Sequence, residues 1–392
     1  MKYLAGTFFL IAAATTAHAQ QAADAVQPEP ASQGAFQALS PQVAAARDAK
    51  AARTPVEASD WMIAAAKPHA VEAGAQVLAD GGTAADALVA VQAVLGLVEP
   101  QSSGLGGGAF LVYYDAASGA LTTLDGRETA PLAATPRLFQ TDEGEPLGFF
   151  DAVVGGRSVG TPGTPALLQA VHDKWGTQDW AALLQPAIDL ADGGFAVSPR
   201  LAGMVARDVD RLQGFGPTAN YFLPGGAPLQ AGDILTNTQY ADTLRAMAAG
   251  GAAAFYSGEI ARDIVATVRG VQGNPGVLSQ RDLSTYVVKE RDPVCVSYRA
   301  HDVCGMGPPS SGALTVGQIL GMLDAYDLSA GPNDPTVRRL IGDASRLAFA
   351  DRGRYMADSD FVPMPTQGLV DPAYLAERAG LLAGDDALPE VA

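Results

Sequence analysis

The stretch TAADALVAVQAVLGLVEPQSSGLGGGAFLVYYDAASGALTTLD, which runs from Thr83 to Asp125, carries the strongest structural pattern in the chain. Residues 84–98 are apolar on most sides, which predicts a largely buried helix that Thr83 can cap. A glycine-rich loop at residues 104–108 follows, and two β-prone runs then flank the turn residues Ser118-Gly119. The stretch therefore predicts a helix, a glycine loop and a β-hairpin, in that order.

Outside this stretch, helical apolar patterns alternate with shorter β-prone runs, which is typical of an α/β fold. Helices are expected at residues 68–78, 166–175, 179–192, 200–212, 236–249, 260–269, 314–326 and 335–352, and the segment 285–306 is rich in β-prone residues. A chain of 392 residues, 48% of them hydrophobic, is long enough for one large domain or two smaller ones.

The first residues predict export. Lys2 precedes an apolar run from Leu4 to Ala14, and Ala17-His18-Ala19 fits the small-x-small pattern of a cleavage site. The run is too short to span a bilayer, which needs about 20 apolar residues. We expect a signal peptide at residues 1–19, a flexible leader rich in Ala, Gln, Pro and Ser at residues 20–56, and the folded region at residues 57–392. The mature protein is then periplasmic or secreted and free of the membrane.

The chain carries 25 Lys and Arg against 42 Asp and Glu, and this net charge of −17 argues against nucleic acid as a partner. No His, Cys and Asp residues have the spacing of a metal site. Gly104-x-Gly106-x-x-Ala109 satisfies a loose dinucleotide-binding pattern, but that motif needs a strand before it and a helix after it. Here the order is inverted. We therefore expect no nucleotide, metal or other cofactor. The glycines of this loop are expected to let backbone segments pass close together.

Cys295 and Cys304, the only cysteines, lie in two short β-prone runs around a polar turn. In a hairpin centred on Arg299-Ala300 the two cysteines face each other. Opposed Cα atoms in an antiparallel ladder lie about 4.5–5.5 Å apart, which is within disulfide range. An exported protein permits the bond. We expect a structural disulfide, and two separate buried thiols are the alternative.

Gly156-Arg157-Ser158-Val159-Gly160 matches G-x-S-x-G, the nucleophile elbow of α/β-hydrolases. That elbow needs a strand directly before the serine and a helix directly after it. Residues 151–154 offer a short strand, but a Pro/Gly loop at residues 161–165 delays any helix. A serine hydrolase that uses Ser158, with an aspartate and His301 downstream, is the main rival enzyme hypothesis.

Several sequence blocks occur together, and each alone is a weak signal. They are PHAVEAG (68–74), DGGTAADA (80–87), GxGGGxF (104–110), DGRETAP (125–131), SVGTPG (158–163), PPSSG (308–312), ADRxxY (350–355) and DxDF (358–361). In this order, from about Trp61 to the end, they resemble the γ-glutamyltranspeptidase family. Ala313 departs from the family pattern, in which a second glycine is expected.

The resemblance implies an N-terminal-nucleophile hydrolase with a four-layer αββα sandwich, of which this chain is the large-subunit part. In that family a precursor cuts itself and exposes a threonine. Its new α-amino group, with a reference pKa of about 7.7–8.0, takes the proton of the attacking hydroxyl. No Thr-x-His block occurs before Ala392, so we expect the nucleophile on a small subunit beyond this chain. We assign no catalytic residue within it.

By the same resemblance, the heterodimer of this chain and its small subunit transfers or hydrolyses the γ-glutamyl group of glutathione and related compounds. This chain alone is then inactive and prone to aggregate. Two other readings stay open, a glutaryl-type β-lactam acylase of the same family and a non-catalytic binding protein.

Arg127, in the DGRETAP block, is the residue to which the resemblance assigns substrate binding. A guanidinium fork suits a bidentate grip on the substrate's α-carboxylate. From the residues alone, an ion pair with Asp125 or Glu128 is the alternative. The remaining polar candidates are expected to be structural, with Asp86, Asp343 and Asp351 as caps or ion-pair partners and Ser310-Ser311 as a turn.

Overall fold

The computed structural model describes residues 39–389 and 391, so the predicted signal peptide at residues 1–19 lies outside the described residues. Two compact units divide the chain, and each is assembled from two separate stretches of sequence. Unit 1 combines the chain up to Gly108 with Glu128–Tyr286, and unit 2 combines Ala109–Arg127 with Val287–Ala392. The predicted helix and hairpin of residues 83–125 therefore belong to different units.

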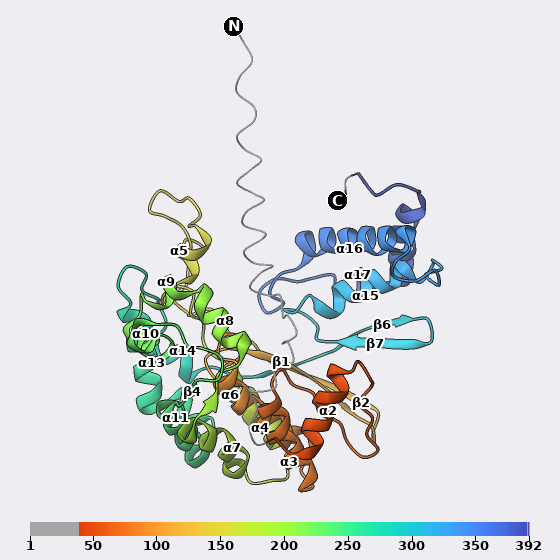
Figure 1. The fold of residues 1–392 in the computed structure, drawn as a ribbon. Helices are drawn as coiled ribbons and strands as arrows, with labels where there is room; N and C mark the ends of the chain where they lie inside the picture. Colours follow the sequence, from red (N-terminus) through yellow and green to blue (C-terminus); the bar gives the residue numbers. More distant parts are fainter. Residues whose placement is uncertain (1–38, 390, 392) are drawn as a thin grey trace. The chain divides into compact units, whose positions relative to one another are not determined.

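Unit 1 is mainly helical, as the periodic apolar patterns predict (Figure 1). Its core forms where α4 packs against α3, α6 and α7, and where α7 packs against α11. Its elements are α2 (Pro41–Ala51), α3 (Pro68–Ala79), α4 (Ala84–Val98), α5 (Phe149–Val153), α6 (Thr164–Trp175), α7 (Trp180–Gly193), β3 (Phe195–Ala196), α8 (Pro199–Arg207), α9 (Val209–Leu212), α10 (Gly216–Phe222), η1 (Pro224–Gly226), β4 (Ile234–Leu235), α11 (Thr238–Gly250), α12 (Ala253–Tyr256), α13 (Gly258–Gly270) and α14 (Gln280–Ser284).

Helix α4 lies in the core of unit 1 and has the bounds that its sequence predicts. Val89, Ala90 and Val94 are completely buried in it. The predicted cap is confirmed, because the Thr83 hydroxyl accepts a hydrogen bond from the N3 backbone of the helix. The facing helix α3 approaches closely at Gly74, where a Cβ would lie 2.6 Å from Val91 Cγ2. Small residues thus set the distance between these two helices.

Two predictions for unit 1 are corrected. The flexible leader proposed for residues 20–56 contains helix α2, which Ser40 and Pro41 start and in which only Val43 is buried. Its sparse apolar pattern hid it from the sequence, because a helix with one buried side chain has almost no periodic signal. The single helix expected at residues 200–212 is two helices, α8 and α9, that meet at the non-helical Asp208.

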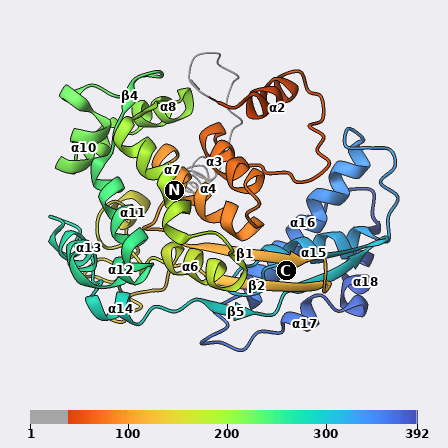
Figure 2. The same ribbon diagram turned by 90° about the horizontal axis from the view of Figure 1, so that it is seen from below.

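Unit 2 contains a three-stranded antiparallel sheet with the order β1-β2-β5. Strands β1 (Ala109–Asp115) and β2 (Ala120–Gly126) form the predicted hairpin, and β5 (Lys289–Arg291) pairs with the other side of β2. Figure 2 shows the three strands side by side. The central strand β2 therefore joins residues that lie far apart in the sequence.

The rest of unit 2 consists of a second hairpin and a group of helices. Helix α15 (Gly312–Leu323) lies between α16 (Pro335–Tyr355) and the hairpin of β6 (Val294–Tyr298) and β7 (His301–Gly305) (Figure 1). The smaller helices α17 (Thr366–Leu369), α18 (Pro372–Gly380) and η2 (Leu381–Ala383) follow. Across residues 39–389 and 391, no helix is both long enough and apolar enough to cross a membrane.

The β6–β7 hairpin has the register that the sequence predicts. Cys295 and Cys304 are directly opposed, and the structure joins them by a disulfide with a Cα–Cα distance of 4.0 Å. Arg299 in the turn has a φ of 53°, in the left-handed region that a two-residue hairpin turn requires. The bond ties together the two strands that pack against α15.

Candidate functional site

The DGRETAP block begins at the end of the central strand of unit 2, where Asp125 and Arg127 lie two residues apart. Asp125 is only 7% exposed, and its Oδ1 accepts a hydrogen bond of 2.9 Å from the backbone N–H of Arg127. This local contact folds the chain into a short turn as it leaves β2. Arg127 itself is exposed, and its guanidinium carbon lies 5.8 Å from the centre of the Phe110 ring. The side chain to which the sequence assigns substrate binding is therefore presented at a fixed strand end.

Asp125 has a second partner, Arg291, on the neighbouring strand. Its Oδ2 accepts a hydrogen bond of 2.8 Å from Arg291 Nε. The strand register explains the contact, because Arg291 pairs with Thr123, two residues before Asp125 on the same face of β2. The Thr123 hydroxyl also donates to the backbone carbonyl of Arg291. Side-chain and backbone contacts thus fix Arg291 beside the strand end.

Asp360, from the DxDF block, completes this cluster. Arg291 donates to both of its carboxylate oxygens, at 3.1 Å and 2.9 Å, and Lys289 forms a further ion pair with it. Hydrogen bonds from Arg291 and then from Lys289 lower the pKa of Asp360 to about 2. Charge-assisted bidentate contacts of this kind are among the strongest hydrogen bonds in proteins. The DxDF block is therefore held against the DGRETAP block through one arginine.

The PPSSG block also lies in unit 2, near the same loop. The hydroxyl of Ser359 donates to the carbonyl of Pro308 at 3.4 Å. Ser310 Oγ accepts the backbone N–H of Gly312, as expected of a turn, and Ser311 Oγ accepts a hydrogen bond of 2.9 Å from Arg352 Nε. The Pro308-Pro309 peptide bond is cis. The structure thus brings together sequence blocks that lie up to about 230 residues apart.

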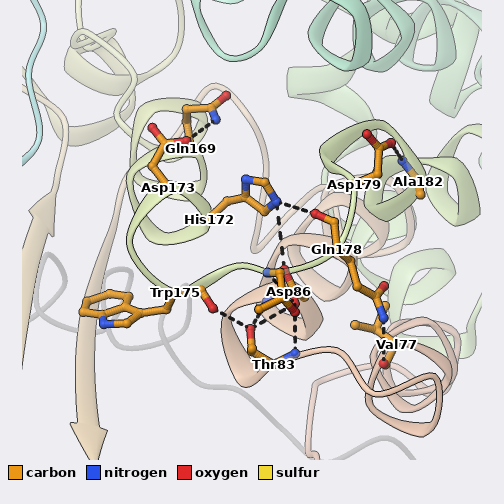
Figure 3. A network of polar contacts seen from close by, with 11 residues as sticks. Val77, Thr83, Asp86, Gln169, His172, Asp173, Trp175, Gln178, Asp179 and Ala182 are labelled. Carbon is orange, nitrogen blue, oxygen red and sulfur yellow. Dashed lines mark hydrogen bonds and ion pairs between the residues drawn. The ribbon is translucent and has the colours of Figure 1, made fainter.

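Asp86 is a buried structural residue of unit 1, as the sequence predicts (Figure 3). Its carboxylate accepts hydrogen bonds of 2.9–3.1 Å from the backbone N–H groups of Thr83 and Thr177. Burial opposes its ionisation, but these hydrogen bonds outweigh burial and lower the pKa of Asp86 below its ordinary value. His172 lies 4.0 Å away and donates through Nε2 to the carbonyl of Gln178. The network locks α4 to the loop between α6 and α7.

Asp343 and Asp351, which the sequence analysis expects to be structural, are ion-pair partners in unit 2. Asp343 lies 3.0 Å from Arg346, and its other oxygen accepts the backbone N–H of Leu388. Asp351 pairs with Arg378 at 3.1 Å and accepts hydrogen bonds from Gln318 and Tyr374. Both carboxylates thus tie α16 to the segments that follow it.

Ser158 does not stand in a nucleophile elbow. Three of the four residues expected to form the strand before it, residues 151–153, belong to helix α5, and the next helix, α6, starts only at Thr164. The exposed Ser158 hydroxyl donates to the carbonyl of Val153 at 2.8 Å. Gly156 is needed for close packing instead, since a Cβ there would lie 2.0 Å from the carbonyl oxygen of Val268. The G-x-S-x-G match therefore reflects packing, and the serine-hydrolase alternative lacks its structural context.

The glycine loop at residues 104–108 differs in part from its prediction. A helix precedes it and a strand follows it, so the inverted order that argues against a dinucleotide site is confirmed. Close backbone packing does not explain its first glycines. Among the described residues, a Cβ at Gly104 would meet nothing nearer than 4.0 Å and one at Gly106 nothing within 4 Å. The carbonyl of Gly107 instead accepts the N–H groups of Gly163 and Thr164, at the start of α6.

Comparisons with known proteins match most of this chain. A family model described as gamma-glutamyltranspeptidase matches residues 70–391. The glutathione hydrolase proenzyme of Bacillus subtilis (strain 168) is 36% identical over 324 residues, which are 82% of this chain and 54% of that protein. The Acylase ACY 1 proenzyme of Pseudomonas sp. (strain V22) is also 36% identical, over 86% of this chain and 60% of that protein. The chain thus spans between half and two thirds of the length of these two relatives.

The fold has a close counterpart among solved structures. The crystal structure of Helicobacter pylori gamma-glutamyltranspeptidase has a TM-score of 0.82 and 35% sequence identity. The match covers 86% of this chain and 95% of the solved chain. Because the family model, the relatives and the solved structure agree, the chain belongs to the gamma-glutamyltranspeptidase family.

Proposed function

We propose that this chain is the substrate-gripping part of an enzyme that transfers or hydrolyses γ-glutamyl groups, with glutathione as the model donor. The observation that carries the proposal is the turn at the end of β2. Asp125 fixes the backbone of Arg127 there, and the guanidinium is exposed beside the Phe110 ring. A guanidinium fork can hold the α-carboxylate of a γ-glutamyl donor by two parallel hydrogen bonds. The name of the Bacillus subtilis relative, a glutathione hydrolase proenzyme, supports this donor.

The reaction needs a nucleophile, which we place on a small subunit cut from the same precursor. The hydroxyl of its N-terminal threonine attacks the γ-glutamyl carbonyl, and the threonine's own α-amino group takes the proton. The amide C–N bond breaks, and the departing amine leaves with that proton. Water or an acceptor amine then attacks the resulting ester, which releases glutamate or a new γ-glutamyl amide and restores the hydroxyl. Arg127 contributes by holding the donor in line for this attack.

The proposal also includes the assembly and its compartment. We place residues 57–392 in the large subunit of a four-layer αββα sandwich that the small subunit completes. The TM-score of 0.82 to a gamma-glutamyltranspeptidase structure supports this architecture. Residues 1–19 have the composition of a signal peptide, and the Cys295–Cys304 disulfide suits an oxidising compartment. We therefore place the enzyme in the periplasm or outside the cell.

The test uses the processed enzyme that carries this chain together with its small subunit. Arg127→Ala is expected to weaken transition-state binding of a γ-glutamyl anilide by about 2–5 kcal/mol, because a desolvated carboxylate loses its partner. Arg127→Lys recovers only part of this, since an ammonium cannot form the fork. The measurement is kcat/KM from the released aniline.

The matched control is Arg354→Ala. Arg354 is also exposed in unit 2 and lies 5.7 Å from the ring of Tyr355, so it resembles Arg127 in exposure and ring contact. It is expected to leave kcat/KM within about twofold of the parent enzyme. If Arg127→Ala behaves like Arg354→Ala, Arg127 does not bind substrate and the proposal fails.

A second candidate function is that of a glutaryl-type β-lactam acylase. It is favoured by the Acylase ACY 1 relative, whose identity of 36% equals that of the first glutathione hydrolase relative. A glutaryl group has the terminal carboxylate of a γ-glutamyl group but lacks its amino group, so Arg127 suits both donors equally. Comparing kcat/KM for a glutaryl anilide and a γ-glutamyl anilide decides between the two. A higher value for the glutaryl donor would favour the acylase.

A further inference from the structure

The carboxylate of Asp125 serves two partners, one through each oxygen. Oδ1 accepts the backbone N–H of Arg127 at 2.9 Å, and Oδ2 accepts Arg291 Nε at 2.8 Å. Asp125 is almost completely buried, so a rotation of its side chain would leave a charged oxygen without a partner in a poorly hydrated place. The contact with Arg291 therefore selects the side-chain orientation in which Asp125 also holds Arg127.

Arg291 is itself held on its other side. Its two terminal nitrogens donate to the two carboxylate oxygens of Asp360, while Nε is aimed at Asp125. Its side chain is 14% exposed, so it is partly shielded from water. A planar guanidinium can bridge two carboxylates with fixed angles, which a single ammonium cannot do. Arg291 is thus a rigid link between the DxDF loop and the strand end that carries Arg127.

We propose that Arg291 is a positioning residue for the substrate grip. It holds Asp125 in the orientation that accepts the Arg127 N–H, and so aims the Arg127 side chain before the donor arrives. This inference rests on the proposed function of Arg127. Without Arg291, the turn at the end of β2 is no longer fixed, and the guanidinium of Arg127 samples other directions. Part of the free energy of donor binding is then used to order the Arg127 side chain. The effect is confined to donors that carry a carboxylate for Arg127 to hold.

The experiment compares two donors on the processed enzyme. One is γ-glutamyl p-nitroanilide, and the other is 4-aminobutyryl p-nitroanilide, which is the same molecule without the α-carboxylate. Arg291→Gln is expected to lower the ratio of their kcat/KM values by about ten- to a hundredfold, mainly through KM for the γ-glutamyl donor. The rate with the 4-aminobutyryl donor changes by less than about threefold. A general loss of structure would lower both rates alike and leave the ratio unchanged, which would overturn the proposal.

The matched control is Arg339→Gln, in helix α16. Arg339 is also 14% exposed, also lies in unit 2, and pairs with the buried Asp343. The Arg339→Gln change removes a comparable ion pair. It should leave the ratio of the two kcat/KM values, γ-glutamyl donor over 4-aminobutyryl donor, at the parent value. Arg291→Lys keeps a cation without the fork, and its ratio should lie between those of the parent and Arg291→Gln. If Arg291→Gln does not fold, a parent-like ratio for Arg291→Lys overturns the proposal.

The double variant Arg127→Ala/Arg291→Gln separates this inference from the proposed function. If Arg291 acts through Arg127, the double variant has the same donor ratio as Arg127→Ala alone. A parent-like ratio in Arg127→Ala would overturn the proposed function itself. A lowered ratio in Arg127→Ala with a parent-like ratio in Arg291→Gln would overturn only the role of Arg291. A further drop in the double variant would show that Arg291 acts on the donor by another route.

Discussion

The carboxylate of Asp360 accepts hydrogen bonds from Arg291 and Lys289, and its ionisation makes a pH-dependent contribution to the stability of unit 2. These contacts lower its pKa from 3.8 to about 2. A depressed pKa in the folded state stabilises the protein above the unfolded value and is lost as the pH falls through the folded value. We expect Asp360→Asn to flatten the loss of stability between about pH 4 and pH 2. Chemical denaturation at a series of pH values measures this, and parallel profiles for parent and variant would contradict it.

At the residue scale, the sequence predicts Arg127 but not what surrounds it. The block DGRETAP resembles a family motif, whereas Arg291 lies in a run of four charged residues, 289–292, with no apolar alternation. A strand of this kind is stabilised by its pairing with β2, which no local pattern contains. The partners of Asp125, the Arg127 backbone N–H and the guanidinium of Arg291, come from the turn and from a neighbouring strand.

At the element scale, the predictions succeed where burial is continuous. Helix α4 has the predicted bounds because a run that is apolar on most sides has one way to be buried. They fail where local signals compete or are absent. Helices α8 and α9 are separated at Asp208, although the apolar pattern continues across it. Helix α2 buries only Val43 and therefore has no face that the sequence could reveal.

The contact between α3 and α4 leads to a prediction about stability. A Cβ on Gly74 would lie 2.2 Å from Ile63 Cδ1 and 2.6 Å from Val91 Cγ2. Gly74→Ala is expected to lower the free energy of unfolding by about 1–3 kcal/mol, because overpacking outweighs the better helix propensity of alanine. Gly203→Ala, in α8, is the control. A Cβ there meets no atom of residues 39–389 within 4 Å, so this change should stabilise the protein by about 0.5–1 kcal/mol. Equal effects of the two changes would contradict the packing argument.

At the scale of the whole molecule, the outer strand β1 is an aggregation risk when this 392-residue chain is made alone. Val112 and Tyr114 on one face of it are 46% and 64% exposed, and β1 is an edge of its sheet. Exposed apolar edge strands pair with other chains. We expect this chain alone to self-associate in size-exclusion chromatography with light scattering and to release no aniline from a γ-glutamyl anilide.

The double change Val112→Lys/Tyr114→Lys tests the cause. Charges on an edge strand oppose pairing with a second copy, so the variant should elute mainly as a monomer. The control is the double change Arg207→Lys/Asp210→Lys, at two exposed positions on the helices of unit 1. It should leave self-association unchanged. A monodisperse parent chain, or one that cleaves the anilide, would refute this prediction.

The discontinuity of unit 2 also has a consequence for biosynthesis. Strand β2 ends at Gly126, but its second neighbour, β5, begins at Lys289, about 160 residues later. At a translation rate of about 5–20 residues per second, the ribosome needs about 8–30 s to make that interval. During this time one side of the nascent β1–β2 hairpin lacks its native neighbour β5. Asp125 also lacks its partner Arg291, because that residue has not yet been synthesised. The newborn polypeptide is therefore most in need of a chaperone or secretion factor before its last third emerges.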